Sequence, residues 1–290
     1  MKYICPTLFA FFVAIITINV NEPAFAQQTA PAIAVISESD SEQRRGTDIF
    51  AQADMETVNQ YIPVDGAPFG MFAFLLRTDE NAVLFDAGLG GETWVQNLEK
   101  NIKPEEIKLV LLTHLHGDHI GGLLNGDARR FPNAKLLCSV QEYEHWFPAD
   151  ADPRTPQLAR IKAAYGQDFA TFNFDDEVFA DSALKIKAID AVGHTPGHTV
   201  FLIETVEGYR ELIIGDLLHV AALQFPKPDI CSRFDMDKEK TVAARKRILD
   251  FAVLEKIPVR GMHLPGPAKI VENNGQGGYR TGVFESRFQR

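Results

Sequence analysis

The sequence predicts an α/β protein built as a four-layer αββα sandwich, in which two β-sheets face each other and helices cover their outer faces. Two observations lead to this prediction. Apolar segments of strand length alternate with helical segments in an N-terminal half and again in a C-terminal half. Each half also carries its own segments rich in histidine and aspartate. We expect these segments to converge at one edge of the sandwich, where loops are free to carry function.

The first 26 residues have the features of an export signal. Lys2 supplies a positive start, residues 8–18 are apolar, and Ala24-Phe25-Ala26 is a small-x-small cleavage sequence. These features predict a signal peptide over residues 1–26, cut after about Ala26, and hence a periplasmic or secreted protein. The apolar stretch is short for a membrane span of about 20 residues, although a membrane anchor stays the alternative.

The rest of the chain reads as one domain over residues 46–290, preceded by a flexible lead-in at residues 27–45 that is polar and irregular. In the first half of the domain, apolar segments bounded by turn residues predict strands. These strands span residues 57–64, 71–78, 82–86, 109–113 and 135–140. Helical segments complete this half at residues 93–101, 104–107 and 141–146.

The second half of the domain repeats the alternation. A proline- and aspartate-rich surface excursion at residues 148–156 precedes a helix at residues 157–165. Strands are predicted at residues 184–189, 199–204 and 211–214. A charged amphipathic helix follows at residues 237–256, with Asp237 as its N-cap. Asn273-Asn274-Gly275 predicts the turn of a final hairpin.

Charge and cysteine content restrict the partners and the redox chemistry. The 290 residues carry a formal net charge of −10 at pH 7, which disfavours nucleic acids and anionic membranes as partners. We therefore expect no nucleic-acid partner and no membrane contact after signal cleavage, although solubility alone would also explain the charge. An oxidising compartment permits a disulfide between Cys138 and Cys231. A buried free thiol is the favoured interpretation of Cys138, which lies in an apolar run.

The most informative segment is Thr113-His114-Leu115-His116-Gly117-Asp118-His119-Ile120-Gly121-Gly122, which follows an apolar run. The two-residue period of a strand sends His114 and His116 to the same side. Gly117 permits a sharp turn and Asp118 suits a helix N-cap, so Asp118 and His119 can face a second site beside the first. Imidazole nitrogens and carboxylate oxygens suit zinc and its first-row neighbours.

Three later segments add side chains of the same kinds: Gly193-His194-Thr195-Pro196-Gly197-His198, Gly215-Asp216 and Met262-His263-Leu264. Together they favour a two-metal site over a loop with surface histidines. The seven candidate metal ligands are His114, His116, Asp118, His119, His194, Asp216 and His263. We interpret His198 as a hydrogen-bonding or packing residue rather than a ligand.

These four segments, together with Val83-Leu84-Phe85-Asp86-Ala87-Gly88, resemble the metallo-β-lactamase fold superfamily in its dinuclear hydrolase branch, from about Phe72 to about His263. The resemblance implies the metallo-β-lactamase fold and two divalent metal ions, with Zn²⁺ favoured and Mn²⁺, Co²⁺ and Fe²⁺ open. It also implies a role for each ligand. The first metal is assigned to His114, His116 and His194, the second to Asp118, His119 and His263, with Asp216 bridging both and Asp86 holding the loop that bears the ligands.

Within the superfamily, the chain resembles most the branch of methyl parathion hydrolases and periplasmic lactonases, through the segment from Gly215 to Phe225. The resemblance suggests a homodimer and an aromatic mouth. Four aromatic side chains are candidates for the substrate pocket, although each would equally suit the core. They are Phe69, Phe72, Trp146 and Phe225.

The implied activity is that of a secreted dinuclear hydrolase of lactones or aryl esters, with phosphotriesters as a side activity. Two metals lower the pKa of a shared water, and the resulting bridging hydroxide attacks the substrate. Asp216 argues against β-lactams, because the β-lactam-hydrolysing branches lack that bridging aspartate as a rule. Asp118 and His219 are the predicted catalytic side chains. His219 is expected to contact the substrate or donate a proton to the leaving alkoxide, or else to be structural.

The expected substrate is a small, neutral or apolar ester or lactone, because an apolar mouth suits acyl chains and aryl groups. A β-lactamase stays as an alternative. So does a glyoxalase-type thioesterase, which would want basic residues near the C-terminus; Arg280, Arg287 and Arg290 form no obvious cluster. A non-catalytic metal-binding protein is the alternative from another class, and the complete ligand set argues against it.

Overall fold

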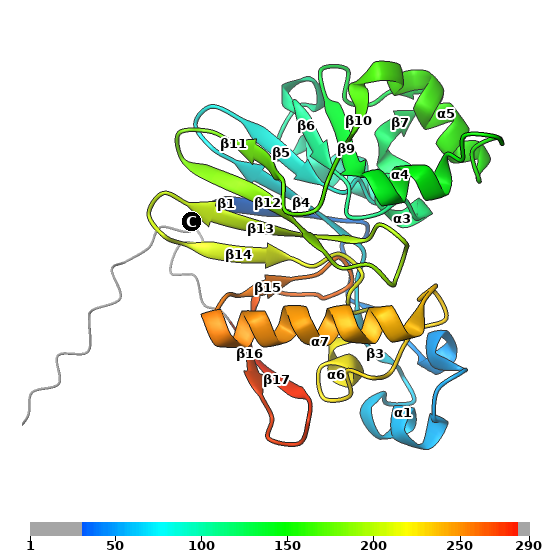
Figure 1. The fold of residues 1–290 in the computed structure, drawn as a ribbon, viewed down its shortest axis with the longest axis vertical. Coiled ribbons are helices and arrows are strands. Elements are labelled where there is room, and N and C mark those ends of the chain that lie inside the picture. Colours follow the sequence, from blue (N-terminus) through cyan, green and yellow to red (C-terminus); the bar gives the residue numbers. More distant parts are fainter. Residues whose placement is uncertain (1–30, 284–290) are drawn as a thin grey trace, which may run out of the picture.

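The computed structural model describes residues 31–283, and these residues form the predicted four-layer αββα sandwich (Figure 1). Two sheets face each other in the middle. Helix α7 (Lys238–Glu255) lies along the outer face of one sheet, and α4 (Val140–Trp146) and α5 (Pro156–Tyr165) cover the other. The predicted signal peptide over residues 1–26 lies outside the described residues, as do Arg287 and Arg290.

The first sheet is mixed, with strands in the order β1-β4-β5-β6-β9-β10. Its first two pairings are antiparallel, and the pairings from β5 to β10 are parallel. Its strands are β1 (Ala32–Ser37), β4 (Phe72–Arg77), β5 (Ala82–Phe85), β6 (Leu109–Leu111), β9 (Lys135–Ser139) and β10 (Phe169–Phe172). Parallel strands β5 and β6 end at the same edge, which brings the loops that follow them together.

The second sheet has strands in the chain order β11-β12-β13-β14-β15-β16-β17. All its pairings are antiparallel except β14 with β15. Its strands are β11 (Glu177–Ala180), β12 (Leu184–Asp190), β13 (Thr199–Thr205), β14 (Arg210–Ile213), β15 (Val259–Arg260), β16 (Lys269–Asn273) and β17 (Tyr279–Val283). The parallel pair β14–β15 places the two loops that follow it at one edge.

Short elements complete the described chain. Two small ribbons pair β2 (Gln43–Arg45) with β3 (Ala67–Phe69) and β7 (Leu124–Asn125) with β8 (Ala128–Arg129). The remaining helices are α1 (Met55–Tyr61), α2 (Glu92–Glu99), α3 (Gly117–Ile120) and α6 (Ala221–Gln224). Single 3₁₀ turns span Thr47–Phe50, Pro104–Glu106, Gly121–Leu123 and Gly166–Asp168. No described helix has the length and apolar character needed to cross a bilayer.

Three apolar layers hold the sandwich together, as its architecture requires. Between the sheets, side chains such as Phe74 and Phe85 of the first sheet pack with Phe201 and Ile213 of the second. Outside the first sheet, α2, α4 and α5 contribute a cluster that includes the fully buried Trp94. Outside the second sheet, the apolar side of α7 packs onto β13 and β14.

Most predicted elements are confirmed, including Asp237 as the N-cap of α7, where its carboxylate accepts a hydrogen bond from the backbone of Lys240. The β16–β17 hairpin also turns where predicted, with Gly275 at a positive φ of 76°.

Two expectations for the N-terminal region are wrong. Residues 57–64 were expected as a strand but contribute to α1, because Asp54 caps that helix through Glu56 N–H and the Thr57 hydroxyl. Part of the expected flexible lead-in at residues 27–45 forms β1 at the edge of the first sheet and β2 of a small ribbon. The residues of β1, Ala-Ile-Ala-Val-Ile-Ser, are apolar apart from the serine and suit a strand, unlike the polar residues around them.

Candidate metal centre

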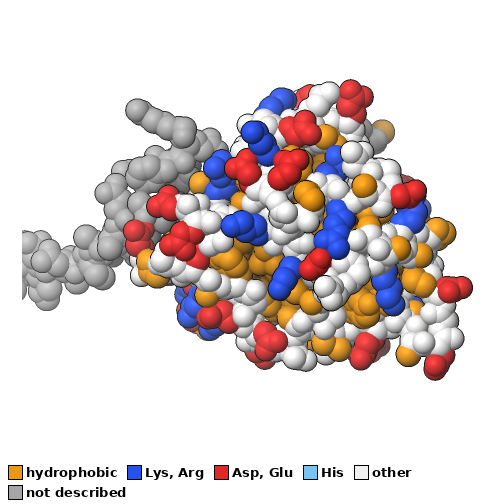
Figure 2. All heavy atoms as spheres, turned by 90° about the horizontal axis from the view of Figure 1, so that it is seen from above, with side chains coloured by type: hydrophobic (Ala, Val, Ile, Leu, Met, Phe, Trp, Pro, Cys, Tyr) orange, Lys and Arg blue, Asp and Glu red, His pale blue; other side chains and the backbone are white. Residues whose placement is uncertain are grey.

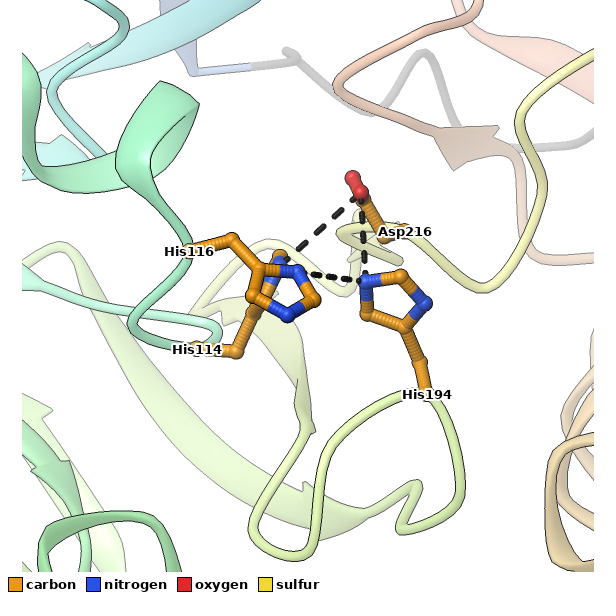
Figure 3. Close-up of side chains that lie close together, drawn as sticks. All are labelled: His114, His116, His194 and Asp216. Atoms are coloured by element: carbon orange, nitrogen blue, oxygen red, sulfur yellow. Dashed lines mark hydrogen bonds and ion pairs between the residues drawn. The ribbon is translucent and has the colours of Figure 1, made fainter. Parts of the chain in front are cut away.

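The candidate site lies where loops from both sheets meet. His114 and His116 follow β6, His194 lies between β12 and β13, and Asp216 follows β14. Their side chains point toward one another (Figure 3). The Nδ1 of His116 lies 3.0 Å from the Nε2 of His114 and 3.0 Å from the Nε2 of His194. Asp216 Oδ2 lies 3.4 Å from His194 Nε2, so three imidazole nitrogens and a carboxylate surround one point.

A second group of side chains shares Asp216 with the first. Asp118 and His119 lie in the short helix α3, and His263 follows β15. Asp216 Oδ1 lies 3.1 Å from His119 Nε2, and Asp216 Oδ2 lies 3.1 Å from His263 Nε2. His263 Nε2 is 3.5 Å from Asp118 Oδ2. All seven predicted ligands therefore converge, and Asp216 is the member common to both groups.

Hydrogen bonds on the far side of the rings fix how the ligands face the centre. The carboxylate of Asp86 accepts from Thr113 N–H and the Thr113 hydroxyl, both at 2.7 Å, and lies 2.7 Å from His119 Nδ1. The Asp86 backbone has a positive φ of 57°, a strained conformation that aims its side chain at this loop. His263 Nδ1 faces the backbone oxygen of Gly70 at 2.8 Å. Such outer contacts orient metal-binding imidazoles.

Asp235 is a supporting residue that the sequence did not reveal. It lies in the loop before α7, and its Oδ1 is 2.9 Å from His194 Nδ1. The backbone of Ser232 donates to its other oxygen at 2.7 Å. Burial raises the pKa of Asp235, but the bond to His194 and nearby positive groups hold that pKa well below its usual value. No motif marks this aspartate, because it lies 41 positions from His194 and meets it only in the fold.

Glu142 was missed for the same reason. This fully buried carboxylate on α4 accepts hydrogen bonds from Leu115 N–H and Trp146 Nε1–H with one oxygen. With the other it accepts from the Thr195 hydroxyl and Gly197 N–H. It thereby ties the loop of His114 and His116 to the loop of His194.

Two glycines of the first motif allow the ligand loop to approach its neighbour. Gly121 N–H donates to Gly88 O at 2.8 Å, and Gly122 N–H donates to Ala87 O at 3.0 Å. A Cβ on Gly122 would lie 2.2 Å from Ala87 O, and one on Gly121 would lie 2.2 Å from Leu89 O. The absence of side chains thus permits the backbone contact that holds the end of α3 beside the loop of Asp86.

The protonation preferences of the centre follow from burial and charge. Burial lowers the pKa of His114 well below its usual value and that of His116 to about 4. Both imidazoles are therefore neutral at neutral pH, and each has a ring nitrogen whose lone pair can bind a metal. Burial also lowers the pKa of His119, but the carboxylates of Asp216, Asp86 and Asp118 more than offset this and hold it well above its usual value. Burial raises the pKa of Asp216, and His263 and His119 hold it well below its usual range. The carboxylates of the centre thus stabilise a positive charge placed among them.

The residues present fit a pair of divalent metal ions. His119 Nε2 and Asp216 Oδ1 are buried and make no hydrogen bond to any described residue, although each points at the other ligands. Unpaired buried polar atoms are costly, and a shared cation would satisfy both. The donors are imidazole nitrogens and carboxylate oxygens, which suit zinc and neighbouring first-row metals.

A cavity of about 410 Å³ opens beside the ligands. Its wall combines His116, Asp118, Asp216, His219 and His263 with apolar side chains. The apolar wall is formed by Ile49, Phe69, Met71, Leu89 and Phe234. Leu89 and Phe234 are 49% and 40% exposed, which is unusual for large apolar side chains and marks the mouth.

Of the four aromatic side chains predicted for the substrate pocket, only Phe69 lines this cavity. Phe225 is 2% exposed and belongs to the core between α7 and the second sheet, and Phe72 packs against the apolar layer between the sheets. Trp146 packs in the core beside α4, with its ring 5.8 Å from that of His116. The prediction is corrected for these three residues, because each has an apolar layer available to bury it.

The two remaining histidines have distinct environments. Asp216 N–H donates to His198 Nε2 at 3.0 Å, and His198 Nδ1 faces Ala191 O at 3.2 Å, so His198 is a hydrogen-bonding residue as predicted. His219 lines the cavity and stacks on the ring of His263 at 5.3 Å. Neither ring nitrogen of His219 makes a hydrogen bond to a described residue. Burial lowers the pKa of His219 to about 3, so its imidazole is neutral at neutral pH.

Comparison with known families agrees with this geometry. The family model described as the metallo-beta-lactamase superfamily matches residues 67–255, which is more than half of the chain. The chain therefore belongs to the metallo-beta-lactamase superfamily of metal-dependent hydrolases.

The two cysteines of the described chain form no disulfide. Cys138 is a buried free thiol, as the sequence favoured, and Cys231 is also free.

Individual curated relatives match the chain only in part and at low sequence identity. A hydroxyacylglutathione hydrolase from Prochlorococcus marinus (strain NATL1A) is 34% identical over 126 residues, covering 42% of this chain and 39% of that protein. The N-acyl homoserine lactonase AttM from Azorhizobium caulinodans is 29% identical over 133 residues, covering 44% of each. The chain thus spans less than half the length of these curated relatives.

Solved structures with the same fold cover nearly the whole chain. The hydrolase AbOPH of the beta-lactamase superfamily has a TM-score of 0.76 and 23% identity, covering 89% of this chain and 95% of that one. AidC, a dizinc quorum-quenching lactonase solved with a product, has a TM-score of 0.76 and 22% identity with the same coverage. At these identities the likeness establishes the fold.

Proposed function

We propose that this protein is an exported dinuclear metal-dependent hydrolase of lactones and aryl esters. The observation that carries the proposal is the position of Asp216, which lies in both ligand groups and opens onto an apolar cavity. A carboxylate shared by two cations offsets their mutual repulsion. The sequence of residues 1–26 supports export, and the names of AidC and AttM support lactones as a substrate class.

The residues around the cavity divide the work of such a reaction. When bound, a pair of divalent metals supplies a water of lowered pKa and polarises the ester carbonyl. The apolar side chains Ile49, Met71 and Phe234 would hold an alkyl or aryl group and exclude water from it. His219, whose neutral ring has one N–H and no partner in the described chain, would donate that N–H to an oxygen of the substrate.

A glyoxalase-type thioesterase is a second candidate, favoured by the match to a hydroxyacylglutathione hydrolase. Against it, Arg280 lies on β17 and pairs with Glu272 at 2.8 Å, and it does not line the cavity. A β-lactamase is disfavoured by Asp216.

The test is a substrate screen with the metal-loaded protein, comparing acyl-homoserine lactones, 4-nitrophenyl esters, S-lactoylglutathione and nitrocefin. We expect lactones and aryl esters to be hydrolysed with kcat/KM values at least about a hundredfold above the values for nitrocefin, a difference of about 2.7 kcal/mol in transition-state binding. Asp216→Asn is the matched control, since it should abolish turnover of every substrate. Thioester turnover above that of the lactones would favour the second candidate, and comparable nitrocefin turnover would overturn the branch assignment.

A further inference from the structure

The cavity beside the metal centre has one feature that the expectation of a neutral or apolar substrate does not explain. Among the described side chains that line it, Arg45 is the only lysine or arginine. Apart from the metal ligands, His219 and Gly117, the rest of the wall is apolar. A fixed positive charge in an apolar wall is costly unless something binds it.

The β2–β3 ribbon brings Arg45 to this wall. Arg45 is paired with Ala67, so Phe69 is its diagonal neighbour on the same face of the ribbon, within reach of a long side chain. The Arg45 guanidinium carbon lies 4.5 Å from the centre of the Phe69 ring. Phe69 in turn stacks on the imidazole of His263 at 4.7 Å with an interplanar angle of 14°. One aromatic ring therefore separates the guanidinium from a metal ligand.

The guanidinium has no hydrogen-bond acceptor among the described residues. Its Nε is buried and without a partner. The nearest carboxylate is that of Asp48, 3.9 Å from the Nη1 of Arg45, beyond hydrogen-bond range, and Asp48 is 55% exposed. A long, solvent-screened pair of this kind contributes little. The Arg45 side chain is 33% exposed, and its donors stay available at the wall of the cavity.

We propose that Arg45 determines specificity by binding a carboxylate at the far end of the acyl chain of an ester or lactone substrate. The inference rests on the proposed function, and it narrows the substrate class of the same cavity. The scissile bond would lie at the metal ligands, the methylene chain along Phe69 and Met71, and the terminal carboxylate against the guanidinium. Arginine suits this task because its planar donors match a carboxylate in pairs.

A purely structural role for Arg45 makes a different prediction. If the guanidinium served only to pack against Phe69, its loss would disturb every substrate equally through His263. If Arg45 binds a carboxylate, its loss should weaken hydrolysis of the charged substrate much more than hydrolysis of the neutral counterpart. A matched pair of substrates therefore separates the two roles.

The experiment compares mono-4-nitrophenyl adipate with 4-nitrophenyl hexanoate, which have acyl chains of the same length and the same leaving group. We expect kcat/KM for the adipate ester to exceed that for the hexanoate ester about tenfold or more, the scale of a charge-assisted hydrogen bond. In Arg45→Met this preference should disappear, because KM should rise far more for the adipate ester than for the hexanoate ester.

Arg233→Met is the control for loss of a positive charge near the mouth. Arg233 lies over the ring of Phe234 at 5.0 Å but does not line the cavity. This variant should keep the adipate preference. Arg45→Lys, which retains the charge, should keep adipate favoured over hexanoate. Arg45→Gln, which removes the charge, serves in place of Arg45→Met if that variant does not fold.

Binding of the two products gives a readout independent of turnover. Calorimetry should find that adipate binds more tightly than hexanoate to the metal-loaded enzyme, and that the difference is lost in Arg45→Met. Equal affinities, an equal loss on both esters, or an adipate preference that survives in Arg45→Met would overturn the role of Arg45. Arg45-dependent adipate binding without hydrolysis of either ester would instead refute the proposed esterase function and leave the anion site standing.

Discussion

Replacing Glu142 with glutamine tests whether the metal loops depend on a carboxylate outside the ligand set. One oxygen of Glu142 accepts from Leu115 N–H at 2.9 Å and Trp146 Nε1–H at 2.7 Å. The other accepts from the Thr195 hydroxyl at 2.7 Å and Gly197 N–H at 2.9 Å. Glutamine presents an NH₂ group in place of one oxygen. One orientation of its amide sets this donor against two N–H groups, and the other sets it against the Gly197 N–H and the Thr195 hydroxyl.

The magnitude follows from that count of unpaired donors. Each buried donor left without an acceptor costs about 1–3 kcal/mol. Relief from burying an ionised carboxylate offsets part of this cost, since burial raises the pKa of Glu142. We expect the free energy of unfolding to fall by about 2–4 kcal/mol, which corresponds to a drop of roughly 5–15 °C in melting temperature for a domain of this size.

The assay is denaturation of the metal-free protein together with metal titration by chelator competition. The first site should lose more affinity than the second, because Leu115 and Gly197 belong to the loops of His116 and His194. Glu144→Gln on the exposed side of the same helix is the matched control, and it should change neither quantity. If Glu142→Gln and Glu144→Gln behave alike in stability and in metal affinity, the carboxylate does not hold these loops together.

Three further substitutions test the partition of roles within the centre. Asp118→Ala should release mainly the second metal, as measured by elemental analysis; equal loss of both metals would contradict the assignment of ligands to sites. Asp235→Asn should lower the affinity for the first metal by about 10–100-fold, because it loosens the orientation of His194. If chelator competition detects no change in affinity, His194 is oriented by other contacts. His219→Ala should keep both metals but lower turnover about tenfold or more. The loss should be larger for alkyl lactones than for nitrophenyl esters, because the nitrophenolate leaves without a donated proton. Unchanged kinetics on both substrates would show that His219 is structural.

The ligands were predictable from the sequence because each sits at a chain position with a local cause. An apolar run predicts β6, the period of a strand sets His114 and His116 on one side, and Gly117 starts the turn into α3. The same reasoning found β5 before Asp86 and β14 before Asp216. The seven ligands meet because these strands end at one edge.

The supporting residues were not predictable by this route. Asp235 and Glu142 lie on segments without a motif, and each acts on a loop 27 or more positions away. The prediction of the aromatic pocket residues was wrong for a related reason. An aromatic residue near a ligand in sequence has an apolar layer to pack into, and Phe225 takes that option. Composition does not tell which of many phenylalanines faces a cavity.

The wall of the cavity combines two parts of the chain. The metal end of the cavity is built mainly from segments within residues 67–255, the part matched by the superfamily model. Arg45 and Ile49, which also line the cavity, come from residues that precede that match. Glu38, also in this leading region, accepts from the backbone of Leu89 and Gly90 and so fixes the loop at the mouth. Since the leading segment enters the fold through β1 and β2 and supplies Arg45, we expect changes there to alter substrate choice without touching a metal ligand.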